Sequence, residues 1–240
     1  MARPPHLPLV LLPGLLNDAR LWGAQVAALS DLADPAAPAA GDLTGFDAMS
    51  DLADSVLARA PARFALAGLS MGGYVALEIL RRAPERVTAL ALVDTQARAD
   101  TPQATDGRRA QMVRSETDFE GVVEALRGRM MLPEHAADPA IGGLFVAMAR
   151  DMGAEVFRRQ QAAIMGRIDG RPFLPRIACP TLVLCGRQDA VTPPELHEEM
   201  AAAIPGARLV FVEGSGHLSA IEKPEAVTAA LRAWLDSALA

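Results

Sequence analysis

Cysteine is scarce in this chain, and its scarcity excludes several classes of protein. Only Cys179 and Cys185 occur among the 240 residues, too few for the disulfide framework of a small secreted domain. Their spacing matches no metal-binding or redox motif. Cys185 lies inside an apolar run and is most simply a small buried residue. This use of cysteine fits a reducing compartment, so we expect a cytoplasmic protein.

Positive charge and long apolar runs are also in short supply. Lys and Arg number 23 against 29 Asp and Glu, which gives a net charge of −6. Because a phosphate backbone requires a basic surface, we expect no nucleic-acid partner. No run reaches the 18 or so apolar residues of a membrane span. The apolar stretch at residues 7–16 faintly resembles a signal peptide, but Pro8 and Pro13 interrupt it and no cleavage site follows closely, so we expect a soluble protein without a cleaved leader.

The sequence does contain an alternation of short apolar runs with helical patterns. Runs that are apolar throughout favour a parallel sheet covered on both faces, and their alternation with helices favours an α/β fold. The length fits one sizeable domain. The expected strands are residues 7–12, a weak one at 36–43, then 63–67, 88–93, 181–185 and 208–212. The expected helices are residues 18–29, 47–60, 71–83, 194–203 and 224–238.

The alternation fails once, between residues 93 and 181. So long a stretch without a convincing strand is not a plain connection, and we expect a helical insertion there. Thr117 to Glu120 has the spacing of a capping box, and Asp138-Pro139 is typical of an N-cap followed by proline at the first helical position. The expected helices of the insertion are residues 107–115, 118–132, 139–152 and 154–168.

The segment Gly68-Leu69-Ser70-Met71-Gly72 lies between an expected strand and an expected helix. A strand that turns abruptly into a helix strains the residue at the bend and leaves no room for side chains two positions away. Gly68 and Gly72 stand at those positions around Ser70, which is the G-x-S-x-G pattern of a nucleophile elbow. The alternative is a glycine-rich turn that carries an inert serine.

A serine nucleophile needs a base, and the chain offers four histidines. His217 follows the last expected strand, so we expect it at the same carboxyl edge of the sheet as Ser70. His6 precedes the first strand, His135 falls in the insertion, and His197 is expected on a charged helical face. We therefore favour His217, although a loop histidine is often only a surface residue.

The base in turn needs an acid that orients it. Asp189 follows the strand at 181–185 in a small tight turn, again at the carboxyl edge. Asp94 ends the preceding strand and is the rival candidate, its other possible role being to cap the entry to the insertion. We favour Asp189, which gives the chain order Ser70, Asp189, His217.

These three motifs, in this order, resemble the α/β-hydrolase superfamily over nearly the whole chain outside the insertion. Within it, the chain resembles small bacterial carboxylesterases and their relatives, the pimeloyl-ACP methyl ester esterases and 3-oxoadipate enol-lactonases. The resemblance implies an α/β-hydrolase fold with a helical lid between the sixth and seventh strands of the family pattern. It divides the chain into a core of residues 1–95 and 179–240 and a lid of residues 96–178. Since only six residues precede the first strand, we expect about six strands, all parallel, without the antiparallel pair that often opens the family's sheet.

The resemblance also implies an oxyanion hole built from two main-chain N–H groups. One belongs to Met71, directly after the nucleophile, and the other to Leu15, which follows the glycine of the loop after the first strand. Pro13-Gly14 stands there in place of the His-Gly of many relatives, a departure in this loop. Cleavage of the N-terminus would remove Leu15, so a signal peptide conflicts with catalysis.

The expected function is that of a serine carboxylesterase acting on short- to medium-chain esters through an acyl-enzyme intermediate. Alternatives on the same triad are enol-lactone hydrolysis, carbon–carbon bond hydrolysis and perhydrolysis, and a further alternative is a ligand-binding protein with little turnover. The expected partner is a small-molecule ester. No cofactor or metal is implied, and the oligomeric state stays open.

The insertion carries the remaining information about substrate. Its methionines and other apolar residues are more typical of lid core than of ligand surface, although some must face the gap over Ser70. Its arginines are expected on a solvated helical face, the alternative being an anionic substrate or carrier. These arginines are Arg108, Arg109, Arg114 and Arg127.

Overall fold

The computed structural model describes residues 7–35 and 41–239. Within this part of the chain one six-stranded sheet has the order β2-β1-β3-β4-β5-β6, and every neighbouring pair of strands is parallel. The strands are β1 (Leu7–Leu12), β2 (Ala33–Pro35), β3 (Phe64–Leu69), β4 (Val87–Val93), β5 (Thr181–Gly186) and β6 (Arg208–Val212). The prediction of about six parallel strands is confirmed.

Five of the predicted strands coincide with β1, β3, β4, β5 and β6 to within two residues at either end. The weak strand predicted at 36–43 is absent from 41–43, the only part of that range that the structure describes. The strand that pairs with β1 is β2, three residues long and earlier in the chain. Residues 36–40 lie outside the described residues, as does His6. An edge strand of three residues carries too little apolar signal to be located by pattern.

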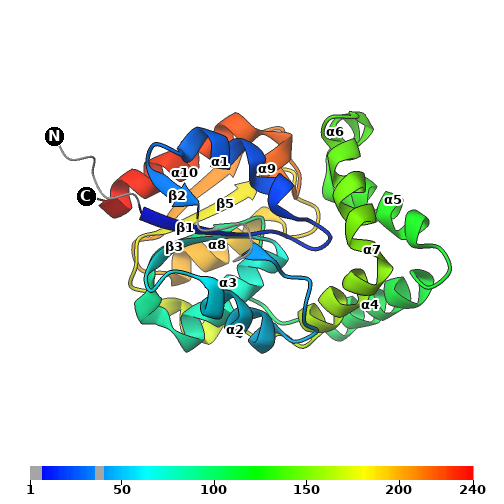
Figure 1. Ribbon diagram of the computed structural model, residues 1–240, viewed down its shortest axis with the longest axis horizontal. Coiled ribbons are helices and arrows are strands. Elements are labelled where there is room, and N and C mark those ends of the chain that lie inside the picture. The colour runs from blue at the N-terminus through cyan, green and yellow to red at the C-terminus, as the bar shows by residue number, and fades with distance from the viewer. Residues whose placement is uncertain (1–6, 36–40, 240) are drawn as a thin grey trace.

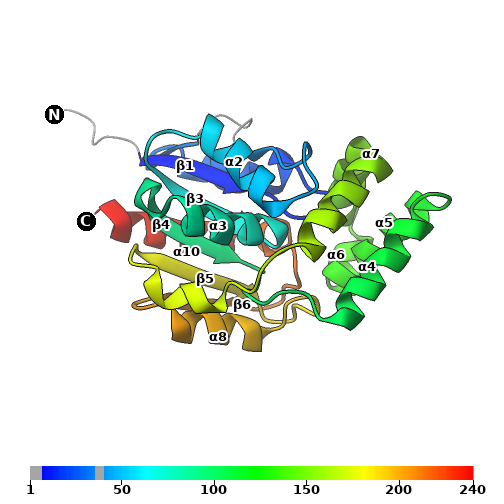
Figure 2. The ribbon, with the colours of Figure 1, turned by 90° about the horizontal axis from the view of Figure 1, so that it is seen from below.

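Helices cover both faces of the sheet (Figures 1 and 2). On one face lie α1 (Gly23–Leu29), α9 (Ser219–Glu222) and α10 (Pro224–Leu239), and on the other α2 (Met49–Arg59), α3 (Met71–Arg82) and α8 (Pro194–Ala203). Short 3-10 helices are η1 (Ala19–Trp22), η3 (Pro84–Arg86) and η4 (Arg171–Arg176). The predicted helix at 18–29 is therefore η1 followed by α1. This covering explains why the central strands read as continuous apolar runs.

The core is densest around β3, β4 and β5. Every residue of β3 and of β5 is buried, and α3 presses Val75 and Ile79, both fully buried, onto the sheet. The bend between β3 and α3 is thus held on both sides by packed elements. A strained conformation there is sustained by the surrounding structure.

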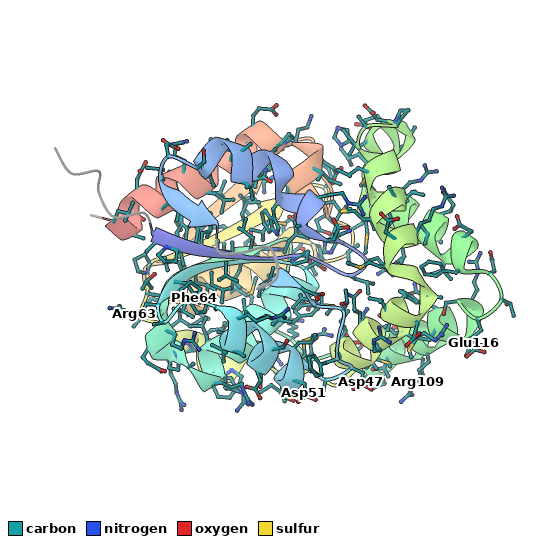
Figure 3. All side chains as sticks on the ribbon, in the orientation of Figure 1. Asp47, Asp51, Arg63, Phe64, Arg109 and Glu116 are labelled. Carbon is teal, nitrogen blue, oxygen red and sulfur yellow. The ribbon has the colours of Figure 1, made fainter. Side chains whose placement is uncertain are left out.

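Four helices between β4 and β5 form what we call the helical insertion, and both ribbon views place it at one end of the sheet (Figures 1 and 2). They are α4 (Pro102–Arg114), α5 (Phe119–Met130), α6 (Pro133–Ala137) and α7 (Gly142–Met165). Arg63 and Phe64, at the beginning of β3, lie at the opposite end (Figure 3). The insertion therefore faces the carboxyl ends of the strands, where ligands bind in such sheets.

The ends of these helices differ from the predicted ones. The N-cap of α5 is Asp118, whose side chain accepts from the N–H of Gly121, so the capping box predicted at Thr117 is wrong by one residue. Asp138 is not an N-cap, because α7 begins only at Gly142, and it is instead the C-cap residue of α6. The break predicted at residue 153 is present as a kink, with Gly153 at φ +76° inside α7. Among the described residues, none of the helices combines the length and apolar character that crossing a bilayer requires.

Candidate active site

Ser70 occupies a strained bend at the carboxyl end of β3. Its φ is +53° and its ψ −114°, a conformation that side-chain-bearing residues rarely adopt. A Cβ on Gly68 would collide with the main chain of Gly72, and a Cβ on Gly72 would collide with the carbonyl of Leu12. The two glycines are thus required by close backbone approach, as the sequence pattern predicted. The bend projects the Ser70 hydroxyl beyond the end of the sheet.

His217 and Asp189 lie within hydrogen-bonding distance in the same place. Nε2 of His217 is 2.8 Å from Oγ of Ser70, and Nδ1 is 2.7 Å from Oδ2 of Asp189. All three side chains are buried, His217 completely. With its proton on Nδ1, His217 donates to Asp189 and accepts the Ser70 hydroxyl at Nε2, which is the arrangement a general base needs. The structure brings together the three residues that the sequence selected.

Asp189 is held as a carboxylate by donors on several sides. The N–H groups of Val191 and Thr192 donate to Oδ1 at 2.7 and 2.9 Å, and the Thr192 hydroxyl donates to Oδ2 at 2.8 Å. Burial alone would raise the pKa of Asp189, but the charge and hydrogen bond of His217 together with these donors lower it. Burial would likewise lower the pKa of His217, yet the neighbouring Asp189 carboxylate outweighs it and raises that pKa. The pair therefore favours a charged imidazolium.

Asp94 makes no hydrogen bond to His217, and its carboxylate does not cap a helix of the insertion, so both roles considered for it are wrong. Its carboxylate accepts from the N–H of Gly186 at 2.9 Å and from the N–H of Ser219 at 2.9 Å. It thereby connects the turn that carries Asp189 with the loop that carries His217. Burial, with repulsion from Asp189, raises the pKa of Asp94 to about 8, because two buried carboxylates so close together resist joint ionisation.

His197 is completely buried, so the prediction of a charged, exposed helical face is wrong at this position. Its Nε2 accepts from the N–H of Thr95 at 2.9 Å, and the Thr95 hydroxyl donates to the carbonyl oxygen of Ser70 at 2.8 Å. Burial lowers the pKa of His197 to about 4, which keeps the ring neutral and able to accept. His197 therefore stabilises the bend at Ser70 indirectly, through its contact with Thr95.

The loop after β1 lies against Ser70. A methyl group on Gly14 would be 3.4 Å from Cβ of Ser70. Residues 14–17 form a turn closed by the N–H of Asn17 donating to the carbonyl of Gly14 at 3.1 Å, with Leu16 at φ +58°. Among the described residues, no hydrogen bond occupies the N–H of Leu15 or of Met71. Two free main-chain donors beside a serine are what an oxyanion hole requires.

The helical insertion holds this loop. Gln160 of α7 is completely buried. Its Oε1 accepts from the N–H of Leu16 at 2.9 Å, and its Nε2 donates to the carbonyl of Leu43 at 3.2 Å. The role of Gln160 was not predicted from the sequence, because helical periodicity does not indicate that a single glutamine is buried.

The loop of His217 is also held by residues that the sequence analysis did not select. The N–H of His217 donates to the carbonyl of Met130 at 2.7 Å. The buried carboxylate of Glu222 accepts from the N–H groups of Gly216 and Leu218 on one oxygen. Its other oxygen lies 2.8 Å from Nδ1 of His135, so His135 pairs with Glu222.

A cavity of about 380 Å³ lies between the helical insertion and the core, and Leu15 is part of its wall. Apolar side chains there are joined by polar ones, including Arg108, Gln111 and Gln161. A larger cavity of about 580 Å³ follows α3 and η4, and neither cavity has Ser70 or His217 in its lining. We assign the candidate site to the smaller cavity, because its wall includes Leu15, from the loop beside Ser70, and Met130, whose carbonyl accepts from the N–H of His217.

The arginines of the insertion divide into two groups. Arg108 donates to Asp100 and to Oε1 of Gln161, both at 2.7 Å, and is only partly exposed, so the prediction of a solvated side chain is wrong for it. Arg109 and Arg114 are exposed and pair with acids of their own segment. Figure 3 shows Arg109 and Glu116 on the outer side of the insertion.

One cluster has the composition of a metal site. Oxygen atoms of Asp94 and Asp189 and the sulfur of Cys185 lie within 4.8 Å of one another. The carboxylates already accept hydrogen bonds from main-chain N–H groups, and burial raises the pKa of Cys185, which keeps it a thiol. Because a thiolate and free lone pairs are what a metal would need, we assign no metal to this cluster.

The comparison with known families agrees with this geometry. The model of the alpha/beta hydrolase family matches residues 9–230. The chain belongs to the alpha/beta hydrolase family. This alpha/beta hydrolase has the family's parallel sheet, with helices on both faces and a serine at the bend after β3.

Relatives of this alpha/beta hydrolase include named enzymes. Two pimeloyl-[acyl-carrier protein] methyl ester esterases of Neisseria meningitidis, of serogroups A and B, are 29% and 30% identical over 193 and 195 residues. These matches span 78% of this chain and 62% and 74% of the two relatives. A thermophilic esterase from Thermogutta terrifontis is 32% identical with a TM-score of 0.87, over 98% of this chain and 91% of that one. An enol-lactonase from Burkholderia xenovorans is 25% identical with a TM-score of 0.82, over 98% and 94%.

Proposed function

We propose that this alpha/beta hydrolase is a serine carboxylesterase that cleaves short- to medium-chain carboxylic esters through an acyl-enzyme intermediate. The observation that carries the proposal is the hydrogen-bonded series from Ser70 through His217 to Asp189. Serine is a weak nucleophile without an adjacent base, and this series supplies both the base and the acid that orients it.

In the proposed reaction Oγ of Ser70 attacks the ester carbonyl while His217 takes the hydroxyl proton at Nε2. Asp189 stabilises the imidazolium that forms. The main-chain N–H groups of Leu15 and Met71 donate to the oxyanion of the tetrahedral intermediate. His217 then gives its proton to the leaving alcohol, and a water molecule, activated by the same histidine, hydrolyses the acyl-enzyme to release the acid.

The cavity and the relatives both support a substrate of small size. The cavity beside Leu15 has a volume of about 380 Å³, near the lower end of the range for small-molecule sites. Its wall combines apolar residues such as Leu126 and Val191 with polar ones. The relatives from Neisseria meningitidis are named for a methyl ester, so esters of small alcohols are the first to test.

We also propose that residues 96–178, which include the helical insertion, act as the lid over this cavity.

Enol-lactone hydrolysis is a second candidate on the same three residues. It is supported by the Burkholderia xenovorans enol-lactonase, whose structure matches nearly the whole chain. A lactone is a cyclic ester, so attack by Ser70 and support of the oxyanion are unchanged. Only the leaving group differs, since it stays attached to the acyl part.

A substrate panel tests the proposal. Purified protein is assayed on p-nitrophenyl esters of increasing chain length, on methyl esters and on lactones. Turnover is expected for the shorter esters, with kcat falling about 10⁴-fold or more in Ser70→Ala. Ser30→Ala, which removes an exposed hydroxyl bonded only to the carbonyl of Ala27, should keep full activity. Turnover that survives in Ser70→Ala would refute the mechanism, and a fluorophosphonate that leaves Ser70 unlabelled would favour a binding protein.

A further inference from the structure

Glu222 takes part in four hydrogen bonds around the His217 loop, as many as Asp189, although none of them is with the side chain of Ser70, His217 or Asp189. Only 3% of its surface is exposed. One carboxylate oxygen, Oε1, accepts from the N–H of Gly216 at 3.0 Å and from the N–H of Leu218 at 3.1 Å. These are the residues immediately before and after His217. A single acceptor thus fixes the main chain on both sides of the proposed base.

The other oxygen of Glu222 faces the helical insertion. Oε2 accepts from the N–H of Leu132 at 3.1 Å and lies 2.8 Å from Nδ1 of His135. Leu132 joins α5 to α6, and His135 belongs to α6. Its side chain is 13% exposed, and that of Glu222 is fully buried. The carboxylate therefore connects two segments about 90 residues apart in the chain.

A third contact joins the same two segments without a side chain. The N–H of His217 itself donates to the carbonyl of Met130, the last residue of α5, at 2.7 Å. A Cβ on Gly216 would lie 2.8 Å from that carbonyl, so the loop passes too close to the insertion for any larger residue there. The position of the His217 ring relative to Ser70 is thus fixed partly from the insertion and not by the sheet alone.

We propose that Glu222 is a positioning residue for His217 and that, through Leu132 and His135, it couples the geometry of this proposed base to the position of the helical insertion. The inference rests on the proposed function and deepens it. A charged acceptor that satisfies several buried donors makes stronger hydrogen bonds than a neutral one. Displacement of a catalytic group by about 1 Å costs on the order of 100-fold in rate, so the loss of this acceptor should affect catalysis more than binding.

The variant Glu222→Asp tests the proposal, since it keeps the charge but withdraws the carboxylate by one methylene. We expect kcat on the best ester to fall about 100-fold with KM nearly unchanged. Glu222→Gln has the original length but one acceptor oxygen, which we expect to stay with the N–H groups of Gly216 and Leu218, so the acceptor for the insertion is lost. Its kcat should lie between those of Glu222→Asp and the wild type, about 10-fold below the wild type. Glu78→Asp is the matched control, because Glu78 is a buried carboxylate of α3 paired with Arg81 and Arg82, and it should leave kcat unchanged.

Coupling to the insertion is tested with His135→Ala. Alone it should lower kcat by several-fold, and in the Glu222→Gln background it should add little, since the contact is already lost. Full additivity of the two changes would overturn the coupling. A kcat within threefold of the wild type in Glu222→Asp would overturn the positioning role. If that variant does not fold, Glu222→Gln with wild-type kcat would overturn it equally.

The result stays distinguishable from failure of the proposed function. A wild type that turns over neither esters nor lactones would refute the function. The positioning role would then be tested through the downfield proton resonance of His217 Nδ1, which needs no substrate. That resonance should weaken in Glu222→Asp through faster exchange, and an unchanged resonance would count against the role.

Discussion

The main-chain N–H of Leu16 donates to Oε1 of Gln160 at 2.9 Å, although 144 residues separate the two in the chain. Leu16 belongs to the loop that offers the N–H of Leu15, and Gln160 belongs to α7 of the helical insertion. The insertion is therefore more than a cover for the cavity. It takes part in shaping the loop that the proposed reaction uses for its oxyanion.

Gln160→Ala should remove this support. We expect kcat to fall about 10-fold with a smaller change in KM, because the loop would then relax and misplace the N–H of Leu15. Gln160→Glu keeps an acceptor for Leu16 but loses the donor to Leu43, and should retain more activity than Gln160→Ala. Steady-state kinetics on one ester check both variants. Equal losses in the two would show that the Leu16 contact is unimportant.

The activity should depend on pH through His217. Its pKa is raised above the usual 6.5 by Asp189, and only the neutral ring can take the Ser70 proton. We therefore expect kcat/KM to rise with pH, with a midpoint above 6.5, and to be lost as His217 becomes protonated.

Asp189→Asn should move that midpoint to lower pH, because the charge that favours the imidazolium is removed. It should also lower the maximal rate about 10⁴-fold, since the ring loses the partner that fixes its tautomer. Asp47→Asn, at an exposed carboxylate, provides the control. A midpoint that is the same in Asp189→Asn and the wild type would contradict the assignment of Asp189.

The glycines of the bend should be intolerant of a methyl group. Gly72→Ala places its Cβ against the carbonyl of Leu12, well inside contact distance. We expect it to lower the free energy of unfolding by about 3 kcal/mol. Gly128→Ala, on α5 with open space around the added Cβ, should instead stabilise by about 0.5 kcal/mol. Urea unfolding measures both, and a Gly72→Ala protein as stable as the wild type would mean that the bend can relax.

Asp94 should give stability a distinctive pH dependence. Its pKa is raised to about 8 in the folded protein and is near 3.9 in an unfolded chain. Between about pH 3.9 and pH 8, Asp94 is protonated in the folded state and ionised in the unfolded chain. The contribution of Asp94 to stability is therefore present at low pH and is lost as pH rises through 8.

Asp94→Asn removes this titration and keeps a residue type that tolerates the φ of +45° at this position. The stability of the wild type relative to Asp94→Asn should therefore decline steadily from pH 4 to pH 8. Thermal or urea unfolding across that range measures it. A constant difference between the two proteins would show that Asp94 stays ionised.

The features that could be predicted from the sequence are those that a few adjacent residues specify. Gly68, Ser70 and Gly72 reveal the bend because the collision that excludes side chains acts over four residues. The positions of Asp189 and His217 followed from parallel strands, whose carboxyl ends meet at one edge.

What could not be predicted depends on how distant elements dock. His197 lies in a charged segment, yet the orientation of α8 on the sheet turns its side chain inward to Thr95. No local sequence pattern indicates that orientation. Glu222 and His135 meet across 87 residues, and no local pattern around either residue indicates that contact. Strand β2 and the helix ends of the insertion were not located because short elements carry little periodic signal.

The chain leaves the sheet at the end of β4 and returns at the start of the neighbouring β5. An excursion that begins and finishes on adjacent strands can be exchanged for another without altering the order of the sheet. Chimaeras that graft a foreign segment between these strands are thus topologically simple to build. Their success would depend on whether the grafted segment has its own equivalents of Gln160 and His135, which could hydrogen-bond to the Leu15 loop and to Glu222 of the recipient.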